Sequence, residues 1–314
     1  MLLNPISWKQ NIAFHVLHFT HSVYILICIL LLFQPKANAA FENVGVSARP
    51  MGMGGAYVAL VNDTSAMIWN PAGLARLNEP EIGLNYLELY GLVNYSFVGW
   101  AYPLQLGRTV GVGVSSSSDP DGLYQELAFN ISAAQEIAKN LHLGLNIKYL
   151  SSAASIGEIS VGTSNGGVVD LGVRYALADG RLAFGLALPN LLSHVRYRRA
   201  ALKNADAKDY NERLARESRI GLALRLDLFS PRLSNAIFAL EFANGDPIFG
   251  GEYVIGNSER RAASVRLGWR LTEGVSRGIT AGLGYRFGNL QLDYAFVGGR
   301  YQSQTSLFSV TLYY

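Results

Sequence analysis

Apolar residues alternate with small or polar residues at a period of two, in one segment after another, from residue 80 to the end of the 314-residue chain. Residues 141–149 show this most clearly, with Leu, Ile and Tyr at the odd positions and His, Gly, Asn and Lys at the even ones. This period places the two sets on opposite faces of a β-strand. Segments 220–228 and 263–271 repeat the pattern. The fold is therefore predicted to be all-β.

The two faces differ in a way that favours a membrane protein. The apolar face is large and unbroken, whereas the second face mixes Gly, Ala, Ser and Asn with isolated charged residues, and only 16% of the chain is charged. A sheet with one fully apolar face needs either a partner sheet or lipid to cover it. A closed barrel in lipid satisfies all backbone hydrogen bonds and has no edges. We therefore favour a transmembrane antiparallel β-barrel, with a soluble double sheet as the alternative.

About fourteen segments carry the alternation, an even number as in bacterial outer-membrane barrels. The predicted strands are 80–89, 93–105, 109–117, 124–137, 141–150, 166–176, 181–188, 219–229, 236–244, 248–255, 261–271, 278–287, 290–297 and 305–314. Tight turns alternate with links that are mostly longer, including 151–165 and 189–218, although links 90–92 and 245–247 are short. Short periplasmic turns and longer outer loops predict that both chain ends are periplasmic.

The first 39 residues have the order of a secretory signal peptide. Lys9 precedes an apolar run at residues 23–33, and Ala37-Asn38-Ala39 forms an A-x-A cleavage site. This order predicts export and removal of residues 1–39, with an uncleaved anchor helix as the alternative.

Several kinds of chemistry are not expected in the exported chain. The only Cys lies within the predicted signal peptide, which excludes a cysteine nucleophile, a Cys-based zinc site and disulfides. His142 and His194 lack a positioned Ser and acid. A net charge of +3 is too small to argue for nucleic acid. We therefore expect no enzyme, metal site or cofactor.

Residues 40–79 do not follow the alternation. Gly52, Gly54 and Gly55 permit close backbone approach and positive φ. Asn70 suits a helix cap, with Pro71 opening a short helical turn. No strand of a βαβ unit precedes the glycines, so a nucleotide-binding loop is not favoured.

Three runs in this segment carry a resemblance. S-A-R-P-M-G-M-G-G-A-Y-V-A-L (47–60), N-D-T-S-A (62–66) and W-N-P-A-G-L-A (69–75) closely resemble the start of PorV/PorQ proteins, within the wider FadL-like group of outer-membrane barrels. The resemblance implies a fourteen-stranded barrel whose N-terminal segment folds into the lumen as a plug. It places the five motif residues Gly52, Gly54, Gly55, Asn70 and Pro71 in that plug. The implied organisation is a signal peptide at 1–39, a plug at 40–79 and a barrel at 80–314.

A plug also follows from size, because a barrel of fourteen strands is too wide for its own side chains to fill. Charged residues on the inner face could pair with each other or with the plug, although solvated wall residues are the plainer expectation for each. The inner charges are Arg174, Arg225, Glu241, Glu252, Arg266 and Asp293.

The longest predicted loop, 189–218, is the candidate ligand site. In fatty-acid members of the wider group, the third and fourth outer loops form a greasy collecting site, and here these two are also the longest. By that resemblance, Leu191, Leu192, Val195 and Tyr197 could hold an acyl chain, with Arg196 or Arg198 near its carboxylate. The alternative is that the basic residues contact anionic lipid head groups or water.

The final strand alternates to the chain end through Phe308, Val310, Leu312 and Tyr314. It resembles the signal read by the barrel-assembly machinery, with an ordinary last strand as the alternative. The sequence therefore predicts a bacterial outer-membrane protein in contact with lipid. The expected function is passive, porin-like transport of hydrophobic small molecules. The alternatives are a PorV-type component of type IX secretion that binds exported proteins, and a purely structural barrel.

Overall fold

The computed structural model describes residues 45–89, 91–177, 180–201, 206–227, 234–257, 261–271, 278–298 and 304–314. Its elements are α2 (Ala48–Gly52), α3 (Ala66–Trp69), the 3-10 helix η1 (Pro71–Arg76), β1 (Glu81–Leu89), β2 (Val93–Leu104), β3 (Arg108–Ser118), β4 (Tyr124–Ala138), β5 (Leu141–Ile156), β6 (Ile159–Leu177), β7 (Leu182–Arg199), β8 (Lys208–Glu212), β9 (Arg219–Asp227), β10 (Ser234–Ala243), β11 (Asp246–Asn257), β12 (Arg261–Arg270), β13 (Gly278–Phe287), β14 (Leu290–Val297) and β15 (Thr305–Tyr313). The predicted signal peptide lies outside the described residues. Among the described helices, none has the length and apolarity to cross a membrane.

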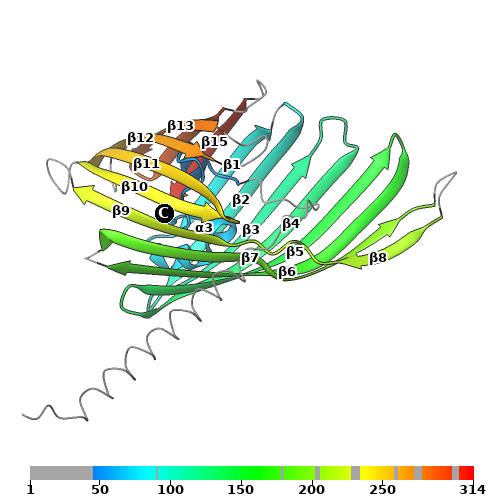
Figure 1. Ribbon diagram of the computed structural model, residues 1–314, viewed down its shortest axis with the longest axis horizontal. Helices are drawn as coiled ribbons and strands as arrows, with labels where there is room; N and C mark the ends of the chain where they lie inside the picture. Colours follow the sequence, from blue (N-terminus) through cyan, green and yellow to red (C-terminus); the bar gives the residue numbers. More distant parts are fainter. Residues whose placement is uncertain are drawn as a thin grey trace, which may run out of the picture. The chain divides into compact units, whose positions relative to one another are not determined.

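Fourteen of these strands close into one antiparallel barrel, as predicted (Figure 1). β15 closes the ring on β1, with Val310 opposite Leu84. In the described part of the chain, β8 pairs with β7 alone and stands outside the ring. Closure gives each wall strand a backbone partner on both sides, so the wall has no free edge.

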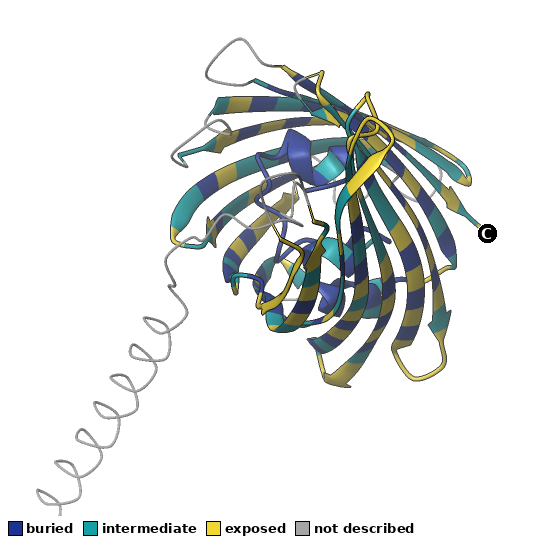
Figure 2. Ribbon diagram, turned by 90° about the vertical axis from the view of Figure 1, so that its right-hand side faces the viewer, coloured by how far each residue is buried: buried dark blue, intermediate teal, exposed yellow. Residues whose placement is uncertain are grey.

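The two faces of the wall are those predicted from the alternation. In β5, Leu145 and Ile147 are exposed on the outside, whereas Asn146 between them is fully buried. In β9, Leu224 is 40% exposed and Ala223 only 2%. Figure 2 shows the same exchange of exposed and buried bands along each strand. An apolar outer band on a closed ring is the surface that hydrocarbon solvates.

Three wall strands are longer than predicted. The predicted loops at 151–165 and 189–218 are wrong where the structure has strand, at 151–156, 159–165, 189–199 and 208–212. Residues 151–165 extend β5 and β6 as a paired hairpin, and β7 runs on to Arg199 and pairs with β8. Ser, Ala, Gly and Thr dominate 151–165 and hide the apolar alternation. Pairing continues through polar contacts instead, as between the buried Ser152 and Ser164 hydroxyls, 2.6 Å apart. We call residues 150–168, 192–201 and 206–214 the lip, which projects beyond the other strands (Figure 1).

A bulge marks the point where the lip leaves the wall. Val169 pairs with Leu192 and Leu171 with Leu188, so residues 189–191 face one residue of β6. Pro189, the first residue of the bulge, has no N–H to donate to the strand ladder. The backbone N–H of Asn190, the next residue, donates to the Asp170 carboxylate at 2.8 Å.

The N-terminal segment, residues 45–77, is enclosed by the wall (Figure 2). Its Tyr57 and Trp69 are at most 1% exposed and belong to the main hydrophobic core. Wall glycines make room for it, since a Cβ added at Gly268 would overlap the backbone of Gly54. Similar close approaches involve Gly144 with Pro71, and Gly185 with Val58. The small residues on the inner face of the strands therefore allow the N-terminal segment to pack closely against the wall.

Candidate functional site

The glycine turn of the N-terminal segment is fixed by hydrogen bonds from three wall strands. The Thr280 hydroxyl donates to the Gly52 carbonyl at 3.0 Å, and Arg219 donates to the Gly55 carbonyl at 3.1 Å. Arg270 donates to the Gly54 carbonyl between them. Gly54 and Gly55 have φ of +70° and +92°, which confirms the expected positive φ at these two positions.

Asn70 joins the segment to itself and to the wall. Its side-chain oxygen accepts from the Ala72 amide and caps η1, with Pro71 at the first position, as predicted. Its amide nitrogen donates to the carbonyls of Val58 at 2.8 Å and Val173 at 3.2 Å. The buried Asn70 side chain thus makes hydrogen bonds to backbone groups of both the N-terminal segment and the wall.

Glu241 on β10 holds the next turn of the segment. One carboxylate oxygen accepts from the backbone amides of Tyr57 and Val58, each at 2.8 Å. The other oxygen accepts from Arg219 on β9 at 2.6 Å. The Arg219 guanidinium also lies 4.3 Å from the ring centroid of Trp69, which adds a cation–π contact.

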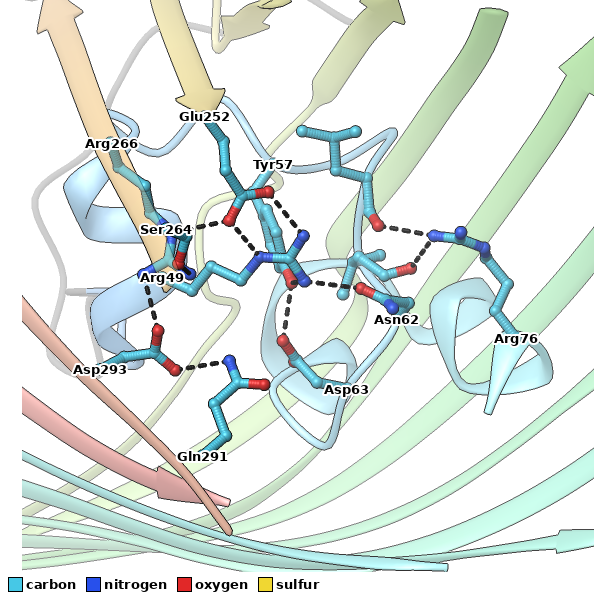
Figure 3. Close-up of polar contacts among 12 residues, drawn as sticks. Arg49, Tyr57, Asn62, Asp63, Arg76, Glu252, Ser264, Arg266, Gln291 and Asp293 are labelled. Atoms are coloured by element: carbon cyan, nitrogen blue, oxygen red, sulfur yellow. Dashed lines mark hydrogen bonds and ion pairs between the residues drawn. The ribbon is translucent and has the colours of Figure 1, made fainter. Parts of the chain in front are cut away.

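A chain of four charged residues links α2 to strands β11, β12 and β14 of the wall (Figure 3). Arg49 makes two bonds to the Glu252 carboxylate, at 3.0 and 2.8 Å. Arg266 donates to Glu252 at 2.7 Å and to Asp293 at 2.6 Å. The three wall side chains, Glu252, Arg266 and Asp293, are at most 3% exposed. Buried charges of this kind are tolerated only when they remain paired.

The inner charges predicted from sequence therefore have several different environments. Glu241, Glu252, Arg266 and Asp293 are buried in ion pairs. The expectation of solvated wall residues fails for these four and for the buried Arg174. Arg174 is buried and donates to the Ala59 carbonyl at 2.8 Å. Arg225 is exposed and lines a cavity. Sequence reasoning missed Arg49 and Arg76, although Arg49 lies inside the S-A-R-P motif.

The two ends of the barrel are named by their features, the terminus end and the loop end. At the terminus end, Glu81 pairs with Tyr313 next to the C-terminus. The loop end is the opposite one, where β1 turns into β2 and the lip projects.

A cavity of about 90 Å³ lies at the loop end and has a largely apolar wall. Val46 and Ile68 contribute from the N-terminal segment, Tyr95 and Ala128 from the wall, and Leu150 and Leu214 from the lip. Lys148 is the basic residue on its lining and pairs with Asp170 at 3.0 Å. The cavity can accept a small, mainly apolar molecule and offers it some polar contacts.

A larger cavity of about 450 Å³ lies at the terminus end and is strongly polar. Arg49, Asp63 and Arg76 line it from the N-terminal segment, and Glu81 and Arg225 from the wall. Because the segment supplies lining residues to both cavities, it lies between them. The loop-end cavity therefore has the more apolar wall, although Glu126, Lys148 and three serines also line it, and the terminus-end cavity is strongly charged. Within the described residues, no group of acidic, His or Cys side chains is arranged to hold a metal ion.

The six residues predicted to bind ligand are not brought together, because they lie on a strand and alternate between its faces. Val195 is fully buried beside Tyr197 in a small core inside the lip. Leu192, at 61% exposure, points outward, and Leu191 is half-buried in the bulge. Arg196 and Arg198 are exposed beside Asp209, at 2.7 and 3.9 Å. None of the six lines the apolar cavity, whose lip residues are Leu150 and Leu214.

The predicted assembly residues share one face of β15. Phe308, Leu312 and Tyr314 are 41–57% exposed, and Val310 is half-buried on the same side. They therefore belong to the outer apolar band.

Several solved structures are similar to this chain, among them two toluene transporters. The Pseudomonas putida toluene transporter TodX matches with a TM-score of 0.62 at 10% identity, covering 87% of this chain and 99% of that one. The Ralstonia pickettii toluene transporter TbuX matches at 0.60 and 14% identity, covering 88% and 100%. A Pseudomonas aeruginosa FadL homologue matches at 0.56 and 11% identity, covering 85% and 98%. No protein-family model and no curated protein sequence matches the chain. These similarities establish a FadL-like fourteen-stranded barrel.

Proposed function

We propose that this chain is a bacterial outer-membrane channel for passive uptake of small hydrophobic molecules. The observation that carries the proposal is the apolar cavity at the loop end, separated by the N-terminal segment from a polar cavity at the terminus end. In this proposal, residues 1–39 are a signal peptide, both termini are periplasmic, the last strand is the assembly signal, and the N-terminal segment is the plug. The fold it shares with toluene transporters supports the same function.

The residues suggest how uptake proceeds. A hydrophobic molecule leaves water beneath the lip and enters the cavity lined by Leu150 and Leu214, where burial of apolar surface favours it. Passage then requires the plug to shift. The plug is held by ion pairs, such as Arg49 with Glu252, and by the buried contacts of Tyr57 and Trp69, so a shift must break both kinds of contact.

A variant that fills the apolar cavity tests the proposal. Ala128→Phe places a ring into the cavity from the inner face of β4. Its control, Ile131→Phe, enlarges an outward side chain on the same strand that is 65% exposed. We expect cells with the native chain or the control to take up radiolabelled toluene faster than cells lacking the protein. Ala128→Phe should abolish that gain at equal levels of heat-modifiable folded barrel. Equal uptake by both variants would remove the cavity from the pathway.

A PorV-type role in type IX secretion is the second candidate. The N-terminal motif supports it, and so does the lip, whose strand β8 is exposed along its whole length. An exposed strand edge can bind another chain by adding a strand. Cross-linking in cells through a photoreactive residue at Tyr210 tests this role. Capture of exported proteins, with no toluene uptake, would favour secretion over transport.

A further inference from the structure

One polar side chain on the loop-end cavity keeps a hydrogen-bond donor unused. Asn130, on the inner face of β4, lines this cavity and is 2% exposed. Its side-chain oxygen accepts from the Asn146 side-chain nitrogen at 3.2 Å, whereas its own side-chain nitrogen has no hydrogen-bond partner among the described residues. A buried donor in this state is unfavourable, because it has given up water and gained no acceptor in return. A ligand that brings an acceptor into the cavity supplies the missing bond.

The neighbouring hydrogen bonds fix which way the Asn130 side chain faces. The Asn146 side-chain nitrogen donates to the Met67 carbonyl at 2.9 Å and to the Asp170 carboxylate at 3.0 Å, as well as to Asn130. The Asn146 side-chain oxygen accepts from the Ser132 hydroxyl at 2.7 Å. Turning the Asn130 side-chain amide round would place its N–H groups against those of Asn146. Its nitrogen is therefore held away from Asn146 and stays available to a ligand.

The charges around the cavity favour a neutral ligand. Glu126 and Lys148 line it, and Lys148 lies directly opposite Asn130 in the β4–β5 register. Lys148 pairs with the buried Asp170 at 3.0 Å. With two acids against one base in this described set, no positive charge remains to balance a ligand carboxylate. A carbonyl oxygen accepts a hydrogen bond without bringing a net charge into a partly apolar site.

We propose that the Asn130 side chain selects neutral molecules that carry a hydrogen-bond acceptor, such as a carbonyl oxygen, on a small apolar body. This inference rests on the proposed transport function and narrows its substrate class. The Asn130 side-chain nitrogen donates to the ligand oxygen, and the apolar body contacts Val46, Leu150 and Leu214. A pure hydrocarbon leaves the donor without an acceptor, and a carboxylate adds an unbalanced charge beside Glu126.

Three probes of similar size test the proposal: toluene has no acceptor, benzaldehyde has a neutral one, and benzoate has an anionic one. Each probe is titrated calorimetrically into the folded full-length barrel in one detergent, with barrel-free micelles as the blank. At neutral pH we expect the native barrel to bind benzaldehyde more tightly than benzoate. The affinity ratio of benzaldehyde to toluene should fall about 5-fold in Asn130→Leu, as expected for the loss of one neutral hydrogen bond.

Two further variants separate the lost donor from other effects of the substitution. Asn130→Asp keeps an oxygen for Asn146 and replaces the unused N–H donors with a second oxygen, so the ratio should fall at least as far as in Asn130→Leu. Asn235→Leu makes the same change in the terminus-end cavity and should leave the ratio unchanged. Heat-modifiability on gels verifies that each variant is folded.

An unchanged ratio in either Asn130 variant, or benzoate binding more tightly than benzaldehyde, would overturn the proposal. Toluene uptake separates this failure from that of the proposed function. If the ratio is unchanged while Ala128→Phe still abolishes toluene uptake, the channel stands and selection by Asn130 falls. If benzaldehyde binding depends on Asn130 while the native barrel gives cells no added toluene uptake, the binding site stands and the transport function falls.

Discussion

The buried ion-pair chain makes Glu252 the residue whose charge matters most to the N-terminal segment. Its carboxylate accepts from Arg49 on the segment and from Arg266 on the wall, and its side chain is 1% exposed. Glu252→Gln keeps the size of the side chain and removes its charge. Arg49 then loses its carboxylate, and Arg266 retains Asp293 and the Ser264 hydroxyl as partners.

The expected cost follows from that geometry. Removing one partner of a buried ion pair destabilises by about 3–5 kcal/mol. The amide oxygen of Gln still accepts one hydrogen bond, so we expect about 3 kcal/mol. Because Arg49 joins α2 to the wall, we also expect the segment to loosen and the barrel to conduct ions in planar bilayers. Urea unfolding of the barrel in vesicles, followed by tryptophan fluorescence, measures the first effect.

Asp227→Asn is the matched control. Asp227 pairs with Arg181 at 3.2 Å, but that arginine side chain is 65% exposed, so the pair should contribute less than about 1 kcal/mol. The control should unfold almost as the native barrel does and remain closed to ions. Equal destabilisation by the two substitutions, or no added conductance with Glu252→Gln, would refute the role given to the buried chain.

Three further substitutions test other parts of the structure. Leu224→Arg on the outer face should lower the free energy of unfolding in lipid by about 2–4 kcal/mol, whereas Ala223→Ser on the inner face should cost much less; equal costs would mean that the faces are reversed. Gly268→Val should overlap the backbone of Gly54 and displace the segment, making residues 45–77 accessible to added protease while the wall stays resistant. Asn70→Ala should destabilise by about 1 kcal/mol or more through the lost cap of η1, measured by urea unfolding, and an unchanged midpoint would contradict that role.

The wall could be predicted from sequence because one period carries the information for every strand. Hydrocarbon outside and the N-terminal segment inside select side chains of opposite kinds at alternate positions, as at Leu224 and Ala223. The prediction failed where that contrast is absent. In residues 151–165, Ser, Gly and Ala occupy both faces, so the sequence pattern does not predict the projecting hairpin there.

The contacts of the site were harder to predict from sequence, because the residues that make them lie far apart in the chain. Arg49 and Glu252 are separated by 203 positions, and Asn70 and Val173 by 103. Alternation places Glu252 on the inner face but does not identify the cation it contacts. The candidate ligand residues failed for a related reason. An apolar, aromatic run in a loop could converge on one molecule, but on a strand Leu192 and Val195 turn to opposite sides.

The kind of contact that holds the segment bears on the proposed transport. Apolar contacts alone would give an N-terminal segment that leaves its place only by exposing Trp69 and its neighbours to water, since that side chain is 1% exposed. Hydrogen bonds to backbone carbonyls behave differently, because water can take the place of a lost partner. At the terminus end, Arg76 donates to the carbonyls of Leu60 and Val61 and also lines the polar cavity. Water entering that cavity can take over these bonds, so we expect this part of the segment to loosen first.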